Sequence, residues 1–139
     1  LVAVRLDAGE DIVQSIAEAA RREGLAHALI VSGVGSVDRY HVHVVETPGG
    51  MIQDVFLRGE GPYDILSLAG MVIAGRVHAH ITLANRTGAL GGHLEEGSRI
   101  LTFGMVVLAE ATGADLTGWD RVGRLAQTGS SRGGAENMA

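Results

Sequence analysis

One helical segment followed by a long succession of strand-like segments constrains the fold of this sequence most. Residues 10–23 carry apolar side chains at helical spacing, and Gly24 follows where the end of a helix favours glycine. The apolar stripe of this predicted helix has four members: Ile12, Ile16, Ala19 and Ala20. Because the other apolar segments up to residue 110 have strand lengths, we expect an α+β domain. Its mostly antiparallel, multi-stranded sheet would be packed by one main helix.

Turn-forming residues divide the rest of the chain into predicted strands. Two hairpins are expected, one around TPGG at 47–50 and one around Ala74 and Gly75, because Pro and Gly favour tight bends. A Gly-rich turn is expected at 33–36, and a loop at 85–97. The predicted strands are 1–6, 26–33, 40–46, 52–57, 63–73, 76–84 and 100–110.

Two histidines in the predicted strand 76–84 have a spacing that suits metal ligands. Successive strand side chains point to opposite faces, so His78 and His80 share one face. His93 can supply a third imidazole, because the two glycines before it let the backbone bend into conformations closed to other residues. Three imidazoles with an open fourth position are typical of catalytic zinc sites. We therefore predict a divalent metal at His78, His80 and His93, with zinc favoured over copper, nickel and iron.

Other polar residues are candidates for supporting roles at this site. His41 and His43 share a face of one predicted strand and could provide a fourth ligand, a proton-transfer group or a substrate contact. Ordinary structural histidines are the alternative for both. Glu46 and Asp64 are candidate acid/base residues, with a solvated carboxylate as the alternative for each. His27, at the start of a buried-looking strand, is expected to be structural.

The composition excludes several classes of protein. No cysteine is present, which excludes disulfides, thiolate metal sites and cysteine nucleophiles. A formal net charge of −5, without any lysine, disfavours contact with the phosphate backbone of a nucleic acid. The apolar runs fall well short of the roughly 20 residues that a membrane-spanning helix needs. No stretch has the pattern of a signal peptide, so we expect a soluble, cytoplasmic protein without membrane contact.

The final part of the chain differs from the rest in composition. From Ala111 onward it becomes rich in Gly, Ser and polar residues, and residues 113–139 are predicted to form a C-terminal extension. We expect partial disorder there, above all after Gly129. Trp119, Val122 and Leu125 are apolar enough to dock on the domain or on a neighbouring subunit.

Four separated blocks together resemble one known family. They are GVGSV (33–37), GPYDILSLAG (61–70), HAHITLANRTGALGGHL (78–94) and MVVLAE (105–110). In this order they are similar to the plants-and-prokaryotes conserved (PPC) domain, and the similarity covers residues 1–112. The chain looks like a prokaryotic, stand-alone member. This resemblance implies an α+β domain that assembles as a homotrimer.

The resemblance also bears on the metal site and on DNA. Prokaryotic members commonly carry the HxH and GGH histidines as metal ligands, which correspond here to His78, His80 and His93. Plant members join the domain to AT-hook segments and take part in DNA binding, whereas this chain has no Arg-Gly-Arg-Pro core. Met105 stands where many relatives have Glu, so any role of that carboxylate does not carry over.

Three functions follow as hypotheses. The first is a metal-dependent protein that binds or acts on a small molecule through the three histidines, as an enzyme of unspecified reaction or as a binding protein. The second is a DNA-binding or transcription-associated protein, as the DNA-binding label that the family carries from its plant members suggests. The third is a trimeric scaffold in which the metal only stabilises the fold.

Overall fold

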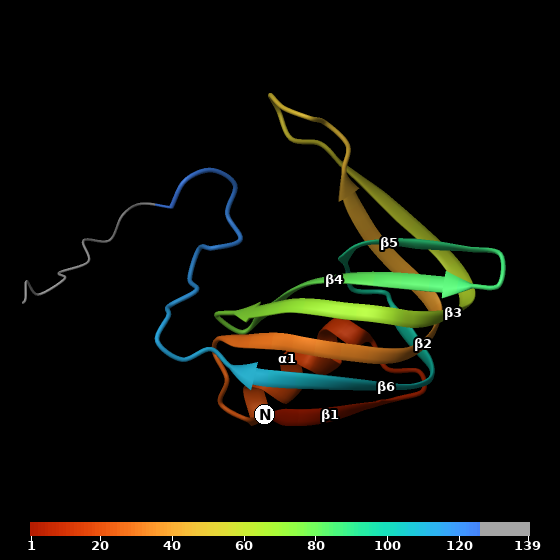
Figure 1. Cartoon of the computed structure of the whole chain (residues 1–139), viewed down its shortest axis with the longest axis horizontal. Coiled ribbons are helices and arrows are strands. Elements are labelled where there is room, and N and C mark those ends of the chain that lie inside the picture. The colour runs from red at the N-terminus through yellow and green to blue at the C-terminus, as the bar shows by residue number, and fades with distance from the viewer. Residues whose placement is uncertain (126–139) are drawn as a thin grey trace, which may run out of the picture.

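The computed structural model describes residues 1–125 as six strands and one helix (Figure 1). The predicted disorder after Gly129 concerns residues outside this range. The elements are β1 (Val2–Asp7), α1 (Ile12–Arg22), β2 (Ala28–Val45), β3 (Asp54–Ile73), β4 (Arg76–Asn85), β5 (Gly88–Leu94) and β6 (Arg99–Glu110). The strands form one sheet in the order β1-β6-β2-β3-β4-β5, and each neighbouring pair is antiparallel. The predicted α+β fold with a mostly antiparallel sheet is therefore confirmed.

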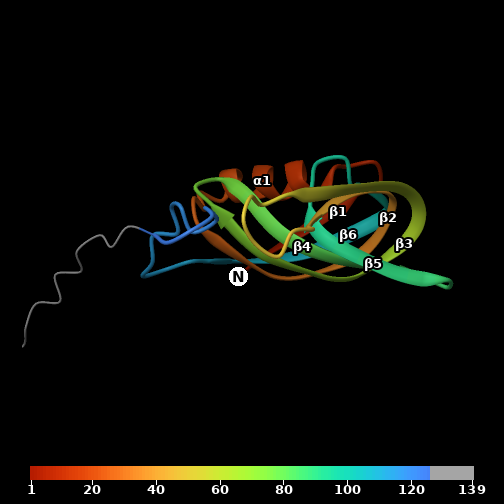
Figure 2. The same cartoon turned by 90° about the horizontal axis from the view of Figure 1, so that it is seen from above.

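Helix α1 lies within the predicted segment 10–23 but begins two residues later, at Ile12. The Asp11 side chain accepts a hydrogen bond from the backbone N–H of Gln14 at 3.0 Å, which caps the first turn. Two arginines occupy the last turn, where positive charge suits the helix dipole. Gly24 follows with a φ of +68°, a conformation that glycine adopts without strain. The predicted apolar stripe is buried, and it packs the helix onto one face of the sheet (Figure 2).

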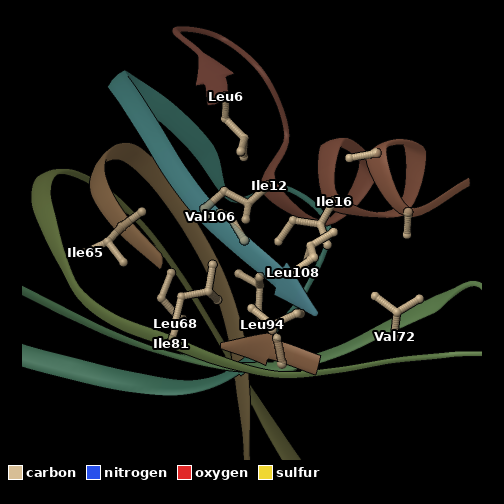
Figure 3. Close-up of a cluster of buried hydrophobic side chains, with 14 of the residues drawn as sticks. Leu6, Ile12, Ile16, Ile65, Leu68, Val72, Ile81, Leu94, Val106 and Leu108 are labelled. Atoms are coloured by element: carbon tan, nitrogen blue, oxygen red, sulfur yellow. The ribbon is translucent and has the colours of Figure 1, made fainter. Parts of the chain in front are cut away.

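The hydrophobic core lies between the helix and this face of the sheet. Figure 3 shows Ile12 and Ile16 of α1 beside Leu108 of β6, with Leu68 and Ile81 of β3 and β4 farther along the core. Alternate residues of the strands point inward, as a half-buried antiparallel sheet requires. In β6, for example, the even-numbered Ile100, Val106 and Leu108 are buried.

The sheet also closes on itself at one end, because β5 pairs with β2 as well as with β4. Strands β2, β3, β4 and β5 thus form a ring of pairings. The ends of β2 and β3 continue beyond the ring as a projecting hairpin (Figure 1). This closure is what brings histidines from β2, β4 and β5 to one place.

Two predicted connections are in fact strand. The expected turn at 33–36 lies inside β2, and the expected loop at 85–97 contains β5. Glycine in the first segment serves a close approach between strands, since a Cβ on Gly35 would lie 2.2 Å from the carbonyl oxygen of Phe103. The predicted strands 26–33 and 40–46 consequently merge into β2, and 52–57 and 63–73 merge into β3.

The start of the extension is held against the domain. The buried side chain of Leu116 anchors it, and the imidazole of His27 lies 3.2 Å from the carboxylate of Asp115. Trp119 and Leu125 are each about half exposed, whereas Val122 is 86% exposed. Within the described residues, no helix combines the length and the apolar character that a membrane crossing needs.

Candidate metal centre

His78 and His80 occupy β4 and project from the face opposite the core. Ala79 between them is fully buried, so the alternation of the strand turns the two imidazoles outward together. Their ring centroids are 5.8 Å apart. This part of the site follows from the period of two that the HAH sequence predicts.

His93 reaches the same place from β5 rather than from a loop. In the sheet it lies directly opposite His80 of β4 on one side and His43 of β2 on the other. Directly opposed residues of antiparallel strands share a face, so the imidazoles of His80, His93 and His43 form a row across the strands. The ring of His93 is 4.5 Å from that of His78 and 5.6 Å from that of His80.

The three predicted ligands converge. One nitrogen from each of His78, His80 and His93 lies within 4.8 Å of the others, a spacing that one metal ion can bridge. All three donors are imidazoles, which suit zinc, copper, nickel and iron. The residues present therefore fit a divalent transition metal.

The glycines before His93 have a different purpose from the predicted one. Neither Gly91 nor Gly92 has a positive φ, so they do not supply a bend. A Cβ on Gly91 would lie 2.5 Å from the carbonyl oxygen of Ile81, and one on Gly92 would lie 2.6 Å from that of His43. Because glycine has no side chain, β5 can lie close to both β4 and β2 at these two positions, and this places His93 in the cluster.

The surroundings of His93 keep its ring neutral. Burial, reinforced by the nearby imidazoles of His78 and His43, lowers its pKa to about 4, while the carboxylate of Glu95 opposes this shift. A neutral imidazole has a free lone pair, which is the form that binds a metal.

A second cluster shares His93. His43, His93 and Glu95 also bring ligand atoms within 4.8 Å of one another, and His43 Nδ1 lies 2.6 Å from Glu95 Oε1. On its other side, His43 Nε2 is 3.9 Å from the carboxylate of Asp54. His43 is one of the candidates predicted above, whereas Glu95 is not. The signal for Glu95 is its place two residues after His93 in HLE, the spacing that places strand residues on one face.

The other sequence candidates lie outside both clusters. His41 is buried, and its Nδ1 bonds the carbonyl oxygen of Glu96 at 2.7 Å, while its Nε2 has no hydrogen-bond partner within residues 1–125. Asp64 is exposed and pairs with Ala84. It lies five positions before Ala69, the residue of β3 that pairs with His80. Glu46 is exposed just beyond the end of β2, where its backbone N–H bonds Gln53.

A pocket of about 520 Å³ opens beside two of the histidines. It lies over the outer face of the β3–β4 hairpin, and the extension forms its other side. The lining residues are Ala69, Gly70, Met71, Ile73, His78, His80, Trp119 and Asp120. Most of this wall is apolar, so the imidazoles face a space that a small organic molecule can occupy.

Comparison with known proteins finds a family for most of the chain. Residues 1–112 match the model of the Plants and Prokaryotes Conserved (PCC) domain, the same domain that the sequence blocks resemble. Two curated relatives from Synechococcus strains JA-2-3B'a(2-13) and JA-3-3Ab, both named bifunctional protein GlmU, are 31% and 30% identical over 109 residues. Those residues are 78% of this chain but only 16% and 17% of the relatives, so this chain corresponds to a small part of them.

Solved structures share the fold. A PPC protein from Pyrococcus horikoshii has a TM-score of 0.68 at 26% identity, with 82% of this chain and 80% of that chain covered. A metal-containing protein from Archaeoglobus fulgidus has a TM-score of 0.64 at 28% identity, with coverage of 79% and 81%. A proposed DNA-binding protein from Ralstonia eutropha JMP134 has a TM-score of 0.64 at 19% identity, with coverage of 79% and 77%, which shows the fold alone.

Proposed function

Because the chain belongs to the Plants and Prokaryotes Conserved domain family, we propose that it binds a divalent metal through His78, His80 and His93 and presents that metal to a small molecule. The observation that carries this proposal is the approach of three imidazole nitrogens to within 4.8 Å of one another. The Archaeoglobus fulgidus relative, described as metal-containing, supports it.

Zinc is the metal we propose. Three neutral imidazoles leave one tetrahedral position open, and a metal with an open position can polarise a carbonyl group or activate water. His78, His80 and His93 would hold the ion, and the lowered pKa of His93 keeps that ring able to bind at neutral pH. The apolar pocket beside His78 and His80 favours a ligand-binding role over a purely structural metal.

The second cluster is assigned a supporting role. Both clusters need His93, and Glu95 already interacts with His43 Nδ1 at 2.6 Å, which engages that carboxylate. We therefore propose that the pair formed by His43 and Glu95 orients the imidazole of His93 and is not itself a metal ligand. Carboxylates close to ligating histidines commonly have this effect.

We also propose the homotrimer that the family resemblance implies. The sheet face opposite α1 carries exposed large apolar side chains on alternate positions of β6, and Val34 of β2 lies directly opposite one of them, Met105. Contiguous apolar patches on a protein surface often mark contacts with other proteins. A DNA-binding role has only fold similarity behind it, and the net charge of −5 disfavours it.

Metal analysis tests the proposed site. Purified wild-type protein should contain about one zinc ion per chain, and His80→Ala should retain much less, because it removes one of three ligands. His43→Ala serves as the matched comparison, since it removes a neighbouring imidazole that supports His93 without being one of the three proposed ligands, and it should retain more zinc than His80→Ala. Wild-type protein that takes up no stoichiometric zinc ends the proposal, and loss of metal in His43→Ala alone would move the site to the second cluster.

A further inference from the structure

The extension contributes residues to the pocket although it lies beyond the matched domain. The matched domain ends at residue 112, and the chain then turns back beside the β3–β4 connection (Figures 1 and 2). Three contacts hold it there: buried Leu116, the His27–Asp115 pair at 3.2 Å, and the approach of Asp120 to Arg76 at 3.3 Å. These contacts carry Trp119 and Asp120 into the wall that faces His78 and His80.

The carboxylate of Asp120 is largely buried and lies between Arg76 and His78. Its side chain is only 12% exposed, and its Oδ2 lies between Arg76 Nη2 at 3.3 Å and His78 Nδ1 at 4.0 Å. The guanidinium balances the negative charge of this carboxylate, so Asp120 adds little net charge to the pocket. At 4.0 Å the approach to His78 is longer than a hydrogen bond, so the influence of Asp120 on this ring is electrostatic. A negative carboxylate on the Nδ1 side favours a proton on that nitrogen and leaves Nε2 free for a metal.

Trp119 gives the pocket an apolar, flat boundary. Trp119, Met71 and Ile73 are the large apolar side chains that line the pocket beside His78 and His80. A divalent metal with three neutral ligands retains its double positive charge. The Glu95 carboxylate, 4.0 Å from His93 Nε2, offsets part of that charge, and the Arg76–Asp120 pair adds no net charge, so the site keeps a positive excess. An anionic oxygen donor with an apolar body matches both properties of this space.

We propose that the extension completes the ligand site, with Trp119 as a specificity-determining wall for small carboxylates that have an apolar body, and Asp120 as a positioning residue for His78. The proposal rests on the metal site proposed above. It adds a ligand class and two residues from outside the matched domain. Through this arrangement, a carboxylate oxygen would take the open metal position while the apolar part packs on the indole ring.

Trp119 is the single tryptophan of the chain, so its fluorescence reports directly on the pocket. Co²⁺, which replaces zinc in imidazole sites and quenches a nearby indole, should quench the fluorescence of the wild-type protein by at least half at one equivalent. The same titration of His80→Ala should leave the fluorescence nearly unchanged. Wild-type protein that binds Co²⁺ by its visible absorption without any quenching would overturn the inference while leaving the metal site intact.

Ligand preference tests the two residues separately. Benzoate should bind the Co²⁺ protein at least tenfold more tightly than acetate, as followed by the visible spectrum. Trp119→Ala should abolish that preference and keep zinc affinity within about twofold. Asp120→Asn should lower zinc affinity about tenfold, in the range known for supporting carboxylates.

Val122→Ala is the matched control, because Val122 belongs to the same extension but is 86% exposed and does not line the pocket. It should change neither zinc affinity nor ligand preference. If Trp119→Ala keeps the preference for benzoate, or if Asp120→Asn behaves like Val122→Ala, the inference is wrong. If the wild-type protein binds neither Co²⁺ nor zinc, the failure lies with the proposed metal site itself.

Discussion

His93 lies among three other imidazoles, and its surroundings keep it uncharged. It shares the face of His43 and His80 across two strand pairings, and its ring lies 4.3 Å from that of His43. Protonation of His93 would place a positive charge in a partly buried site, next to the imidazoles of His43, His78 and His80. The burial that makes His93 a good metal ligand therefore makes the metal-free protein sensitive to acid.

The pH dependence of stability should show this sensitivity. The pKa of His93 is about 4 in the folded protein, against an ordinary value of 6.5. Between these values the unfolded chain binds a proton that the folded chain does not, so the free energy of unfolding decreases as pH falls from 6.5 toward 4. The contribution of His93 is about 3 kcal/mol at most.

Urea unfolding of metal-free protein at pH 7, 5.5 and 4.5 measures this loss. His93→Gln removes the titrating group, so its stability should depend less steeply on pH over the same range. The other histidines of the cluster remain in both proteins and act as an internal reference. Equal pH dependence in wild type and variant would show that His93 is not the source of the acid sensitivity.

Strand β5 is the element that assembles the site. It is seven residues long and pairs with β4 along most of its length and with β2 near its end. Its glycines permit both pairings, because a side chain at Gly91 or Gly92 would meet a carbonyl oxygen of the neighbouring strand. The position of His93 thus depends on the absence of two side chains that never touch a metal.

Gly91→Ala should therefore damage both stability and metal binding. The added methyl would lie 2.5 Å from the Ile81 oxygen, which forces the strands apart, and overpacking of this kind costs about 1–3 kcal/mol. Gly88→Ala is the control in the same strand, since nothing lies within 4 Å of its added Cβ. Thermal unfolding and zinc content of the two variants check this, and equal values would show that β5 tolerates a side chain at position 91.

At the scale of the whole molecule, the two faces of the sheet differ in what covers them. Helix α1 covers one face (Figure 2). The other face carries large apolar side chains that are exposed in the single chain. Leu101, Phe103 and Met105 alternate along β6 on that open face and are 38%, 40% and 51% exposed. Association of copies of the chain through this face would bury these side chains.

Phe103→Asp should consequently dissociate the proposed trimer. A charge buried at an apolar interface costs more than the contact can offset, so the variant should sediment as a monomer while the wild type sediments as a trimer. Val122→Asp adds the same charge at an exposed position away from β6 and should remain trimeric. Analytical ultracentrifugation distinguishes these outcomes, and a monomeric wild type would remove the trimer from the proposed function.

The sequence by itself determined the helix, most of the strand segments and the faces of their side chains, but not β5 or the full length of β2 and β3. Periodicity is a local property, so it identified α1, the outward pair His78 and His80, and the connection at Ala74 and Gly75, and the family blocks identified the domain. Only the tertiary structure decided which distant residues meet. The closure of β5 onto β2 aligned His93 with His43 and Glu95, and the folding back of the extension brought Asp120 to His78. Pairing register and close approach depend on backbone groups far apart in the chain, which leave little trace in local composition.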